Sequence, residues 1–379
     1  MFYEENLGLN ISMFALGMDA YIVAGLLPDM SKSFDKNNAE IGQGVTVFTL
    51  FFALSAPLFS TILAKYSVKN ILLLAMLIFG LANLMTMVST TYNIYIISRG
   101  IAGLGAGLFS PMAVSSGGYL VEHKNKGKAL AFIIAGMSVG TVIGVPVGLQ
   151  ISNLTNWRFA IGIIVIISFI AFISIYVLFP KFKVPTVPGL RKRFKLFINP
   201  KVLKVVLVTM CASIASLGLY TYLSQVINES LSSDYITIFL TTWGVGGLIG
   251  SFGIGLVIDK FKNTKVLVLI ILIILAFSIG LIPLLIKLPI IGLLPFLLWG
   301  CMGWATQVPQ QHILLKNHPE HGGASVALNS SLNYLGSSIG AAIGGFILAQ
   351  DLNIDTLIYG AVLFVVLGII IQSFNIFFD

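Results

Sequence analysis

Residues 99–148 read RGIAGLGAGLFSPMAVSSGGYLVEHKNKGKALAFIIAGMSVGTVIGVPVG, two apolar stretches around a short charged turn. The first stretch carries a single charge, Arg99, and the second carries a glycine at every fourth position from Gly136 to Gly148. A charged side chain in the middle of a bilayer costs about 3 kcal/mol and is usually kept for function. A glycine face allows another helix to approach closely. The stretch therefore predicts two membrane helices, one that carries a functional charge and one that packs closely against another helix.

The composition of the chain supports a membrane location. Of 379 residues, 57% are hydrophobic and only 9% are charged, whereas soluble domains carry about 25% charged residues. The apolar runs are long and unbroken, which favours helices over the short alternating strands of a membrane barrel. Both cysteines lie inside apolar runs, and we expect them to be packing residues and not a disulfide. The net charge of +8 comes from short loops and does not indicate nucleic-acid binding.

Twelve apolar runs have the length of a membrane span, about 20 residues. They lie near residues 8–30, 41–64, 71–90, 93–121, 129–154, 158–180, 202–227, 235–258, 265–286, 289–315, 323–349 and 355–378. The longest connector, residues 181–200, is rich in lysine, arginine and proline. We therefore predict an all-α membrane protein with twelve transmembrane helices in two pseudo-symmetric six-helix bundles, residues 1–180 and 201–379, joined by a basic cytoplasmic linker, residues 181–200.

The distribution of basic residues predicts the orientation. With both termini on the inner side, 17 of the 22 lysines and arginines fall in inner loops and four fall on the outer side, while Arg99 lies within a span. Cytoplasmic loops carry such an excess of positive charge. We therefore expect both termini to be cytoplasmic.

The two halves repeat each other. A second glycine row, Gly336 to Gly344, follows the first by six spans, and the loop sequence from Ser60 corresponds to the one from Gly255. Such repeats are typical of transporters whose halves rock around a site near the middle of the membrane. We expect the glycine rows to provide smooth seams for that motion, although each row is also compatible with ordinary helix packing.

Four stretches carry a resemblance to a known family. They are LGMDAYIVAGLLP (16–28), RGIAGLGAG (99–107), GTVIGVPVG (140–148) and the paired loops that begin at residues 60 and 255. The whole chain resembles the major facilitator superfamily and its fold. More narrowly, it resembles the bacterial twelve-span drug:proton antiporters, in the branch with sugar, nucleobase and chloramphenicol exporters.

The resemblance implies a proton-coupled exporter of a small organic molecule in the bacterial inner membrane, working by alternating access. It implies no cofactor and no metal, protons and the lipid bilayer as partners, and a monomer. One departure is Ala20, where relatives often carry an acid, so the first span keeps a single carboxylate. The gating and antiporter motif residues are Gly103, Gly107, Gly140, Gly144, Pro146, Gly148, Lys65, Asp259 and Lys260.

Asp19 and Arg99 are the clearest ionisable residues within spans. At 1.5 Å per residue, Asp19 lies about 16 Å from the inner end of its span and Arg99 about 9 Å from the outer end of its own. In a hydrocarbon core about 30 Å thick, their depths differ by about 5 Å. We expect them to share a water-accessible cavity in which Asp19 exchanges the coupling proton and Arg99 biases it. A static buried ion pair, or an Arg99 that binds backbone carbonyls, remains an alternative.

Polar and aromatic residues in several spans are candidates for the wall of a substrate cavity. Such walls suit a small amphipathic ligand, and the second half lacks a charge in the middle of its spans, so the ligand need not be strongly charged. Helix packing or a position at the membrane interface is the alternative for each residue. The candidates are Tyr21, Ser115, Tyr119, Tyr220, Tyr222, Gln225, Trp304, Gln307, Gln310, Asn329 and Asn333.

Other classes of function are less compatible with the sequence. A proton-independent facilitator or an importer of a small nutrient stays open as the second hypothesis. An intramembrane enzyme or a receptor is disfavoured, because the sequence has neither a catalytic cluster nor a sizeable soluble domain.

Overall fold

The computed structural model describes residues 2–63, 66–117, 119–121, 126–183, 199–258, 260–261, 263–317, 322–350 and 352–377, which are helical nearly throughout. By their contacts the residues form two units: Met1–Asn37 with Val47–Val187, here unit 1, and Asn38–Thr46 with Pro188–Asp379, here unit 2. The predicted domain borders stay a prediction, because most of the predicted linker (residues 184–198) lies outside the described residues.

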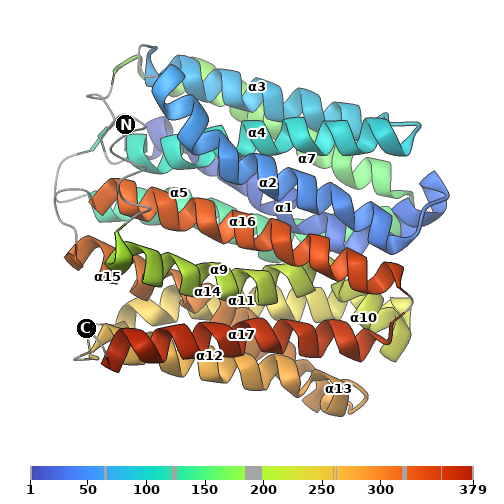
Figure 1. Ribbon diagram of the computed structural model, residues 1–379. Helices are drawn as coiled ribbons and strands as arrows, with labels where there is room; N and C mark the ends of the chain where they lie inside the picture. The colour runs from blue at the N-terminus through green and yellow to red at the C-terminus, as the bar shows by residue number, and fades with distance from the viewer. Residues whose placement is uncertain are drawn as a thin grey trace. The chain divides into compact units, whose positions relative to one another are not determined.

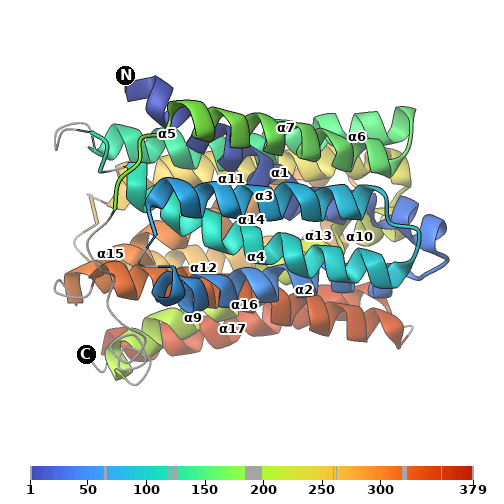
Figure 2. The same ribbon diagram turned by 90° about the horizontal axis from the view of Figure 1, so that it is seen from above.

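Unit 1 is built from long helices that lie side by side (Figure 1). Helix α1 packs against α5 and α7, and α3 packs against α4 and α7 (Figure 2). The elements are α1 (Phe2–Phe34), α2 (Asn38–Ile62, from Val47 on), α3 (Val68–Met87), α4 (Tyr92–Gly117), α5 (Lys126–Val139), the π-helical segment η2 (Gly140–Gly144), α6 (Val145–Leu154) and α7 (Trp157–Leu178).

Unit 2 has its closest helix pairs in α9 with α16 and in α11 with α14, and α17 packs against α9 and α12. Besides the first nine residues of α2, its elements are α9 (Pro200–Thr221), α10 (Leu223–Ser230), η3 (Ser233–Tyr235), α11 (Ile236–Ile258), α12 (Thr264–Gly280), α13 (Ile282–Leu285), η4 (Ile291–Leu293), α14 (Leu294–Ala305), α15 (Gln307–Asn317), α16 (Gly322–Ala349) and α17 (Ile354–Phe377).

Asparagine caps begin several of these helices. The side chains of Asn156, Asn199, Asn263 and Asn353 each accept a hydrogen bond at 3.0 Å from the backbone N–H two residues later. A side-chain oxygen in this position satisfies one of the backbone donors that a helix start leaves free. The caps explain where α7, α9, α12 and α17 begin.

Within the described residues, ten helical stretches have the length and hydropathy of membrane spans. Helix α2 is not among them, and α12 is apolar but has only 17 residues. The predicted number of twelve spans therefore stays a prediction. The ten stretches are Asn6–Phe34, Val68–Met87, Tyr92–Gly117, Lys128–Leu154, Trp157–Leu178, Pro200–Thr221, Ser233–Ile258, Ile291–Lys316, Ser325–Ala349 and Ile354–Phe377.

The two glycine rows lie against a helix of their own unit. In unit 1, a Cβ on Gly136 would meet the carbonyl oxygen of Asn10, and one on Gly140 would meet that of Phe14, so the row packs on the backbone of α1. In unit 2, a Cβ on Gly340 would meet the carbonyl oxygen of Ile214 in α9. These faces are covered within their own unit, as ordinary helix packing predicts, and the expectation that the rows form seams for motion between the halves stays a prediction.

A second kind of close crossing also occurs in both units. In unit 1, a Cβ on Gly103 would meet the backbone oxygen of Phe48, and one on Gly107 that of Phe52, so α4 lies tightly on α2. In unit 2, Gly250 and Gly300 bring α11 and α14 equally close, against backbone oxygens of the partner helix. The units therefore share two types of glycine-mediated helix crossing.

The span that contains α5 and α6 widens into the π-helical segment η2 just before Pro146. Proline has no backbone N–H and its ring crowds the carbonyl four residues earlier. The N–H of Val145 instead reaches the carbonyl of Gly140, five residues earlier. The motif GTVIGVPVG thus produces a local π-helical turn.

Candidate functional site

Asp19 and Arg99 form a direct ion pair inside unit 1. The Nη1 atom of Arg99 on α4 donates to Oδ1 of Asp19 on α1 at 2.7 Å. The two side chains are 1% and 0% exposed, respectively. The structure thus brings together the two charged residues that the sequence singles out, which lie 80 residues apart in the chain.

Asn83 on α3 completes the polar centre. Its Nδ2 donates to Oδ2 of Asp19 at 3.5 Å and to the carbonyl oxygen of Phe79 at 3.1 Å, and its Oδ1 accepts from Nη1 of Arg99 at 3.5 Å. Asn83 is fully buried. The Asn83 amide therefore contacts both members of the ion pair. Its hydrogen bond to the Phe79 carbonyl in its own helix fixes the orientation of the amide.

The guanidinium of Arg99 has one more close neighbour and one unused donor. Its Cζ lies 4.5 Å from the centroid of the Phe48 ring on α2, a cation–π distance. Nη2 contacts the backbone oxygen of Asp19 at 3.5 Å, whereas the buried Nε has no hydrogen-bond partner among the described residues. The charge is thus held mainly by one carboxylate and one aromatic face.

Glycines of the RGIAGLGAG motif position these neighbours. Gly103 lets the backbone of α2 approach at Phe48, and Gly105 lets α3 approach at Phe79, where a Cβ would lie 2.8 Å from the Phe79 backbone nitrogen. Phe48 carries the ring that covers Arg99, and the carbonyl of Phe79 accepts from Asn83. The motif therefore sets the helix spacing that surrounds Arg99 with its partners.

The predicted water-accessible cavity around the pair is not open in this structure. Both side chains are buried, and α1, α3, α4 and the Phe48 ring contact them. A charge pair in such surroundings is stabilised by its own contacts, since little water screens it. Access to Asp19 therefore requires a movement of these helices.

In unit 2, Tyr220 and Tyr222 serve helix packing. The Tyr220 ring lies 4.2 Å from that of Trp243, measured between centroids, and the Tyr222 hydroxyl donates to the carbonyl oxygen of Ala341 at 2.8 Å. The side chain of Tyr222 also fills the space beside Gly344. These contacts fit the alternative from the sequence, helix packing, and a role of either tyrosine in a cavity wall stays a prediction.

Other cavity candidates of unit 2 form a polar group between α15 and α16. Gln307 donates to Oδ1 of Asn333 at 2.8 Å, and the Asn333 carbonyl accepts from Ser213 of α9 at 2.5 Å. Asn329 is fully buried and contacts the hydroxyl of Thr209 at 2.5 Å.

The remaining candidates are scattered. Trp304 packs edge-on to Trp243 with 6.3 Å between centroids, and Gln225 binds Glu229 in its own helix. Tyr21 is buried in α1, while Ser115 and Tyr119 are exposed at the end of α4.

The gating-loop residues can be followed only in part. Lys260 is exposed in the turn after α11. Lys65 and Asp259 lie outside the described residues.

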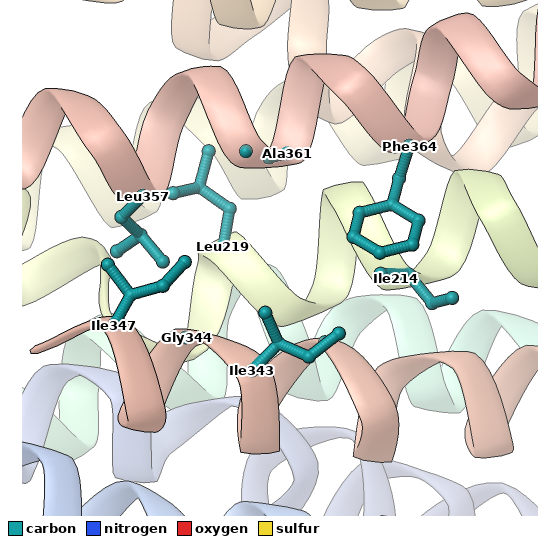
Figure 3. Close-up of a pocket in the computed structure, with 10 residues that line it drawn as sticks. Ile214, Leu219, Ile343, Gly344, Ile347, Leu357, Ala361 and Phe364 are labelled. Atoms are coloured by element: carbon teal, nitrogen blue, oxygen red, sulfur yellow. The ribbon is translucent and has the colours of Figure 1, made fainter. Parts of the chain in front are cut away.

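A pocket in unit 2 between α9, α16 and α17 is lined by apolar side chains and glycines (Figure 3). Its lining side chains are apolar, so any polar group in its wall belongs to the backbone. Its lining residues are Ile214, Leu219, Gly340, Ile343, Gly344, Ile347, Leu357, Gly360, Ala361 and Phe364.

Several site residues escape the sequence analysis. Asn83 carries a signal that could have found it, a lone amide within an apolar span, because polar groups in spans tend to bind one another. Phe48, Thr209 and Ser213 carry no such signal, since aromatic and small hydroxyl residues are common in membrane helices.

Comparisons with known proteins agree with this description. Residues 9–341 match the sequence model of the Major Facilitator Superfamily. The chain is 28% identical over 375 residues to the MFS-type transporter YbcL of Bacillus subtilis, covering 96% of this chain and 93% of YbcL. It is 25% identical over 352 residues to the inner membrane transport protein YdhP of Escherichia coli, covering 92% and 89%. The MFS-type transporter YfhI of Bacillus subtilis is 27% identical over 378 residues, covering 97% and 92%.

The chain therefore belongs to the Major Facilitator Superfamily. Together with its transporter relatives, this membership makes it a multi-pass membrane transporter and not an enzyme.

Proposed function

We propose that this transporter exports a small organic molecule in exchange for protons, by alternating access. The observation that supports the proposal is the buried Asp19–Arg99 pair, a carboxylate that can carry a proton beside a cation that cannot lose one. In membrane transporters such carboxylates commonly belong to proton pathways. The proposal includes twelve spans in two six-helix bundles, cytoplasmic termini, the bacterial inner membrane and a monomer.

The proposed cycle separates and restores the ion pair. While the pair is closed, the carboxylate of Asp19 accepts from Arg99 at 2.7 Å and the two opposite charges lie in contact. When helix movement draws the two apart, the carboxylate loses its countercharge and takes up a proton, because an ionised carboxylate in apolar surroundings is costly. Re-forming the pair releases the proton. If the two steps face opposite sides of the membrane, one proton crosses in each cycle.

Asp19→Asn tests this proposal. The amide keeps an oxygen that can accept from Arg99 but cannot ionise, so we expect proton-driven transport to fall at least about tenfold while expression stays normal. The transported solute is first identified as the molecule that accumulates in cells lacking the protein. Its uptake into everted membrane vesicles is then measured with and without a protonophore.

Asp29→Asn is the matched control. Asp29 lies nearer the C-terminal end of α1, it is half-buried, and it accepts from Ser152 at 3.2 Å. We expect this variant to transport at the wild-type rate. Undiminished transport by Asp19→Asn would remove Asp19 from the mechanism, and transport that persists with the protonophore would favour a proton-independent facilitator.

A further inference from the structure

A buried polar cluster lies where α9, α15 and α16 meet in unit 2. It comprises Thr209, Gln310 and Asn329, which are 1%, 1% and 0% exposed. The Thr209 hydroxyl contacts the amide oxygens of both Gln310 and Asn329. The amide nitrogens, Nε2 of Gln310 and Nδ2 of Asn329, are buried and have no hydrogen-bond partner among the described residues.

The Thr209 hydroxyl and the two side-chain amides cannot supply all of one another's hydrogen-bond partners. A hydroxyl has a single hydrogen to donate, so it can serve only one of the two amide oxygens. If either amide turns by 180°, its nitrogen donates to the Thr209 oxygen and the hydroxyl donates to the other amide. The Thr209 hydroxyl can also donate to the carbonyl oxygen of Val205 at 3.3 Å, so both amides can turn and donate to the hydroxyl oxygen. If one amide turns, one carbonyl oxygen and one NH₂ group stay unpaired; if both turn, both carbonyl oxygens stay unpaired. A buried unpaired polar group lowers the stability of the fold unless a ligand or water pairs with it.

The cluster lies beside Pro309, where the backbone hydrogen bonding of a membrane helix is weakened. Helix α14 ends at Ala305 and α15 begins at Gln307, but Thr306 between them keeps helical backbone angles and its N–H reaches the Met302 carbonyl at 3.2 Å. Pro309 cannot donate a backbone hydrogen bond, and the next N–H, that of Gln310, reaches the Thr306 carbonyl only at 3.4 Å. A helix can bend at a proline, so this part of the span is a place where α15 can move.

The surroundings of the cluster favour an uncharged ligand. One turn away, Gln307 and Asn333 bind each other across the same two helices. In the described part of unit 2, the aspartates, glutamates, lysines and arginines lie in loops or terminal turns, and His312 of α15 is exposed. A neutral ligand with a donor and an acceptor matches the oxygen and the NH₂ group that stay unpaired when one amide turns.

We propose that Gln310 and Asn329 bind an uncharged polar group of the substrate, one that carries both a hydrogen-bond donor and an acceptor, such as an amide or a hydroxyl. The inference rests on the proposed function, since it assumes a transported organic molecule. Thr209 is a positioning residue that orients the two amides. The site opens when α15 moves away from α9 and α16.

The test measures binding and stability on the same purified full-length protein. The probes are chloramphenicol, which is uncharged and carries an amide and hydroxyls, and tetraphenylphosphonium, a cation without donors. Binding is followed by quenching of tryptophan fluorescence, since Trp299 and Trp304 lie on α14. The wild-type protein should bind chloramphenicol more tightly than tetraphenylphosphonium.

Gln310→Leu and Asn329→Leu should each weaken chloramphenicol binding about tenfold or more, the effect of losing about 1.4 kcal/mol. The melting temperature of the ligand-free variants should stay unchanged or rise, because a leucine of similar size removes an unpaired amide. A purely structural role predicts the opposite pattern, with lower stability and unchanged affinity. Thr242→Val is the control, since this exposed hydroxyl bonds only to the Ile238 carbonyl of its own helix, and it should bind as the wild type does.

Failure of the site and failure of proton coupling give different results. Wild-type affinity in both leucine variants, or no binding of chloramphenicol to the wild-type protein, overturns the site whatever Asp19→Asn does. Weakened binding in the leucine variants together with undiminished transport by Asp19→Asn supports the site and refutes proton coupling through Asp19.

Discussion

Arg99→Leu is expected to lower the free energy of unfolding by about 3–5 kcal/mol and to abolish transport. The change leaves the fully buried Asp19 without its 2.7 Å partner, and removing one member of a buried pair leaves a charge uncompensated. Asn83 cannot replace the lost cation, because its contact with Asp19 is a 3.5 Å hydrogen bond from a neutral amide. The measurement is unfolding of the purified protein in detergent, followed by tryptophan fluorescence.

The double variant Arg99→Leu/Asp19→Leu separates the contribution of the ion pair to stability from that of side-chain packing. Replacing both charges by apolar side chains is often close to neutral, so we expect most of the stability to return while transport stays lost. Arg158→Leu is the control, since Arg158 is half-buried and bonds to Ser33 and to the Ser89 carbonyl. Its loss should cost only about 1–2 kcal/mol. If Arg99→Leu and Arg158→Leu lower the free energy of unfolding equally, an unpaired, buried Asp19 carries no extra cost.

Gly140→Ala is expected to destabilise unit 1 by about 1–3 kcal/mol, although it adds one methyl group. The new Cβ would collide with the carbonyl oxygen of Phe14, so α1 and the π-helical segment must move apart. Gly340→Ala in unit 2 should behave alike, because its Cβ would collide with the carbonyl of Ile214. Both losses appear as a lower melting temperature in detergent.

Gly253→Ala and Gly255→Ala are the matched controls for these changes. A Cβ at either position has no heavy atom within 4 Å. Both variants should be as stable as the wild type or slightly more stable, because alanine favours a helix over glycine by about 1 kcal/mol. If Gly140→Ala melts at the same temperature as these controls, the close crossing of α1 and η2 contributes nothing to stability.

The sequence predicts the class of fold and one central contact of the site. Composition and long apolar runs identify membrane helices, and the depths of Asp19 and Arg99 in their spans bring the two charges within reach of each other. Depth alone does not reveal a third partner, so Asn83 and Phe48 are found only once α2 and α3 are placed.

The glycine rows show the limit of reading a sequence pattern. A four-residue step predicts which side chains share a face but not which helix covers that face. The sequence therefore does not reveal that α1 of the same unit covers the row from Gly136 to Gly148. The same limit applies to Tyr220 and Tyr222, whose pattern suits a cavity wall and a packed core equally well.

The π-helical segment η2 explains how glycines four residues apart can follow one straight neighbour. In an α-helix of 3.6 residues per turn, each four-residue step overshoots a full turn by about 40°, so a long row drifts around the helix. Bonds that reach back five residues widen the turn and reverse part of this drift between Gly140 and Gly144. The π-helical segment before Pro146 thus keeps the later glycines on the face of the helix that contacts α1. Without this segment, Gly148 would rotate away from Ile22, and the row would lose contact with α1 at its far end.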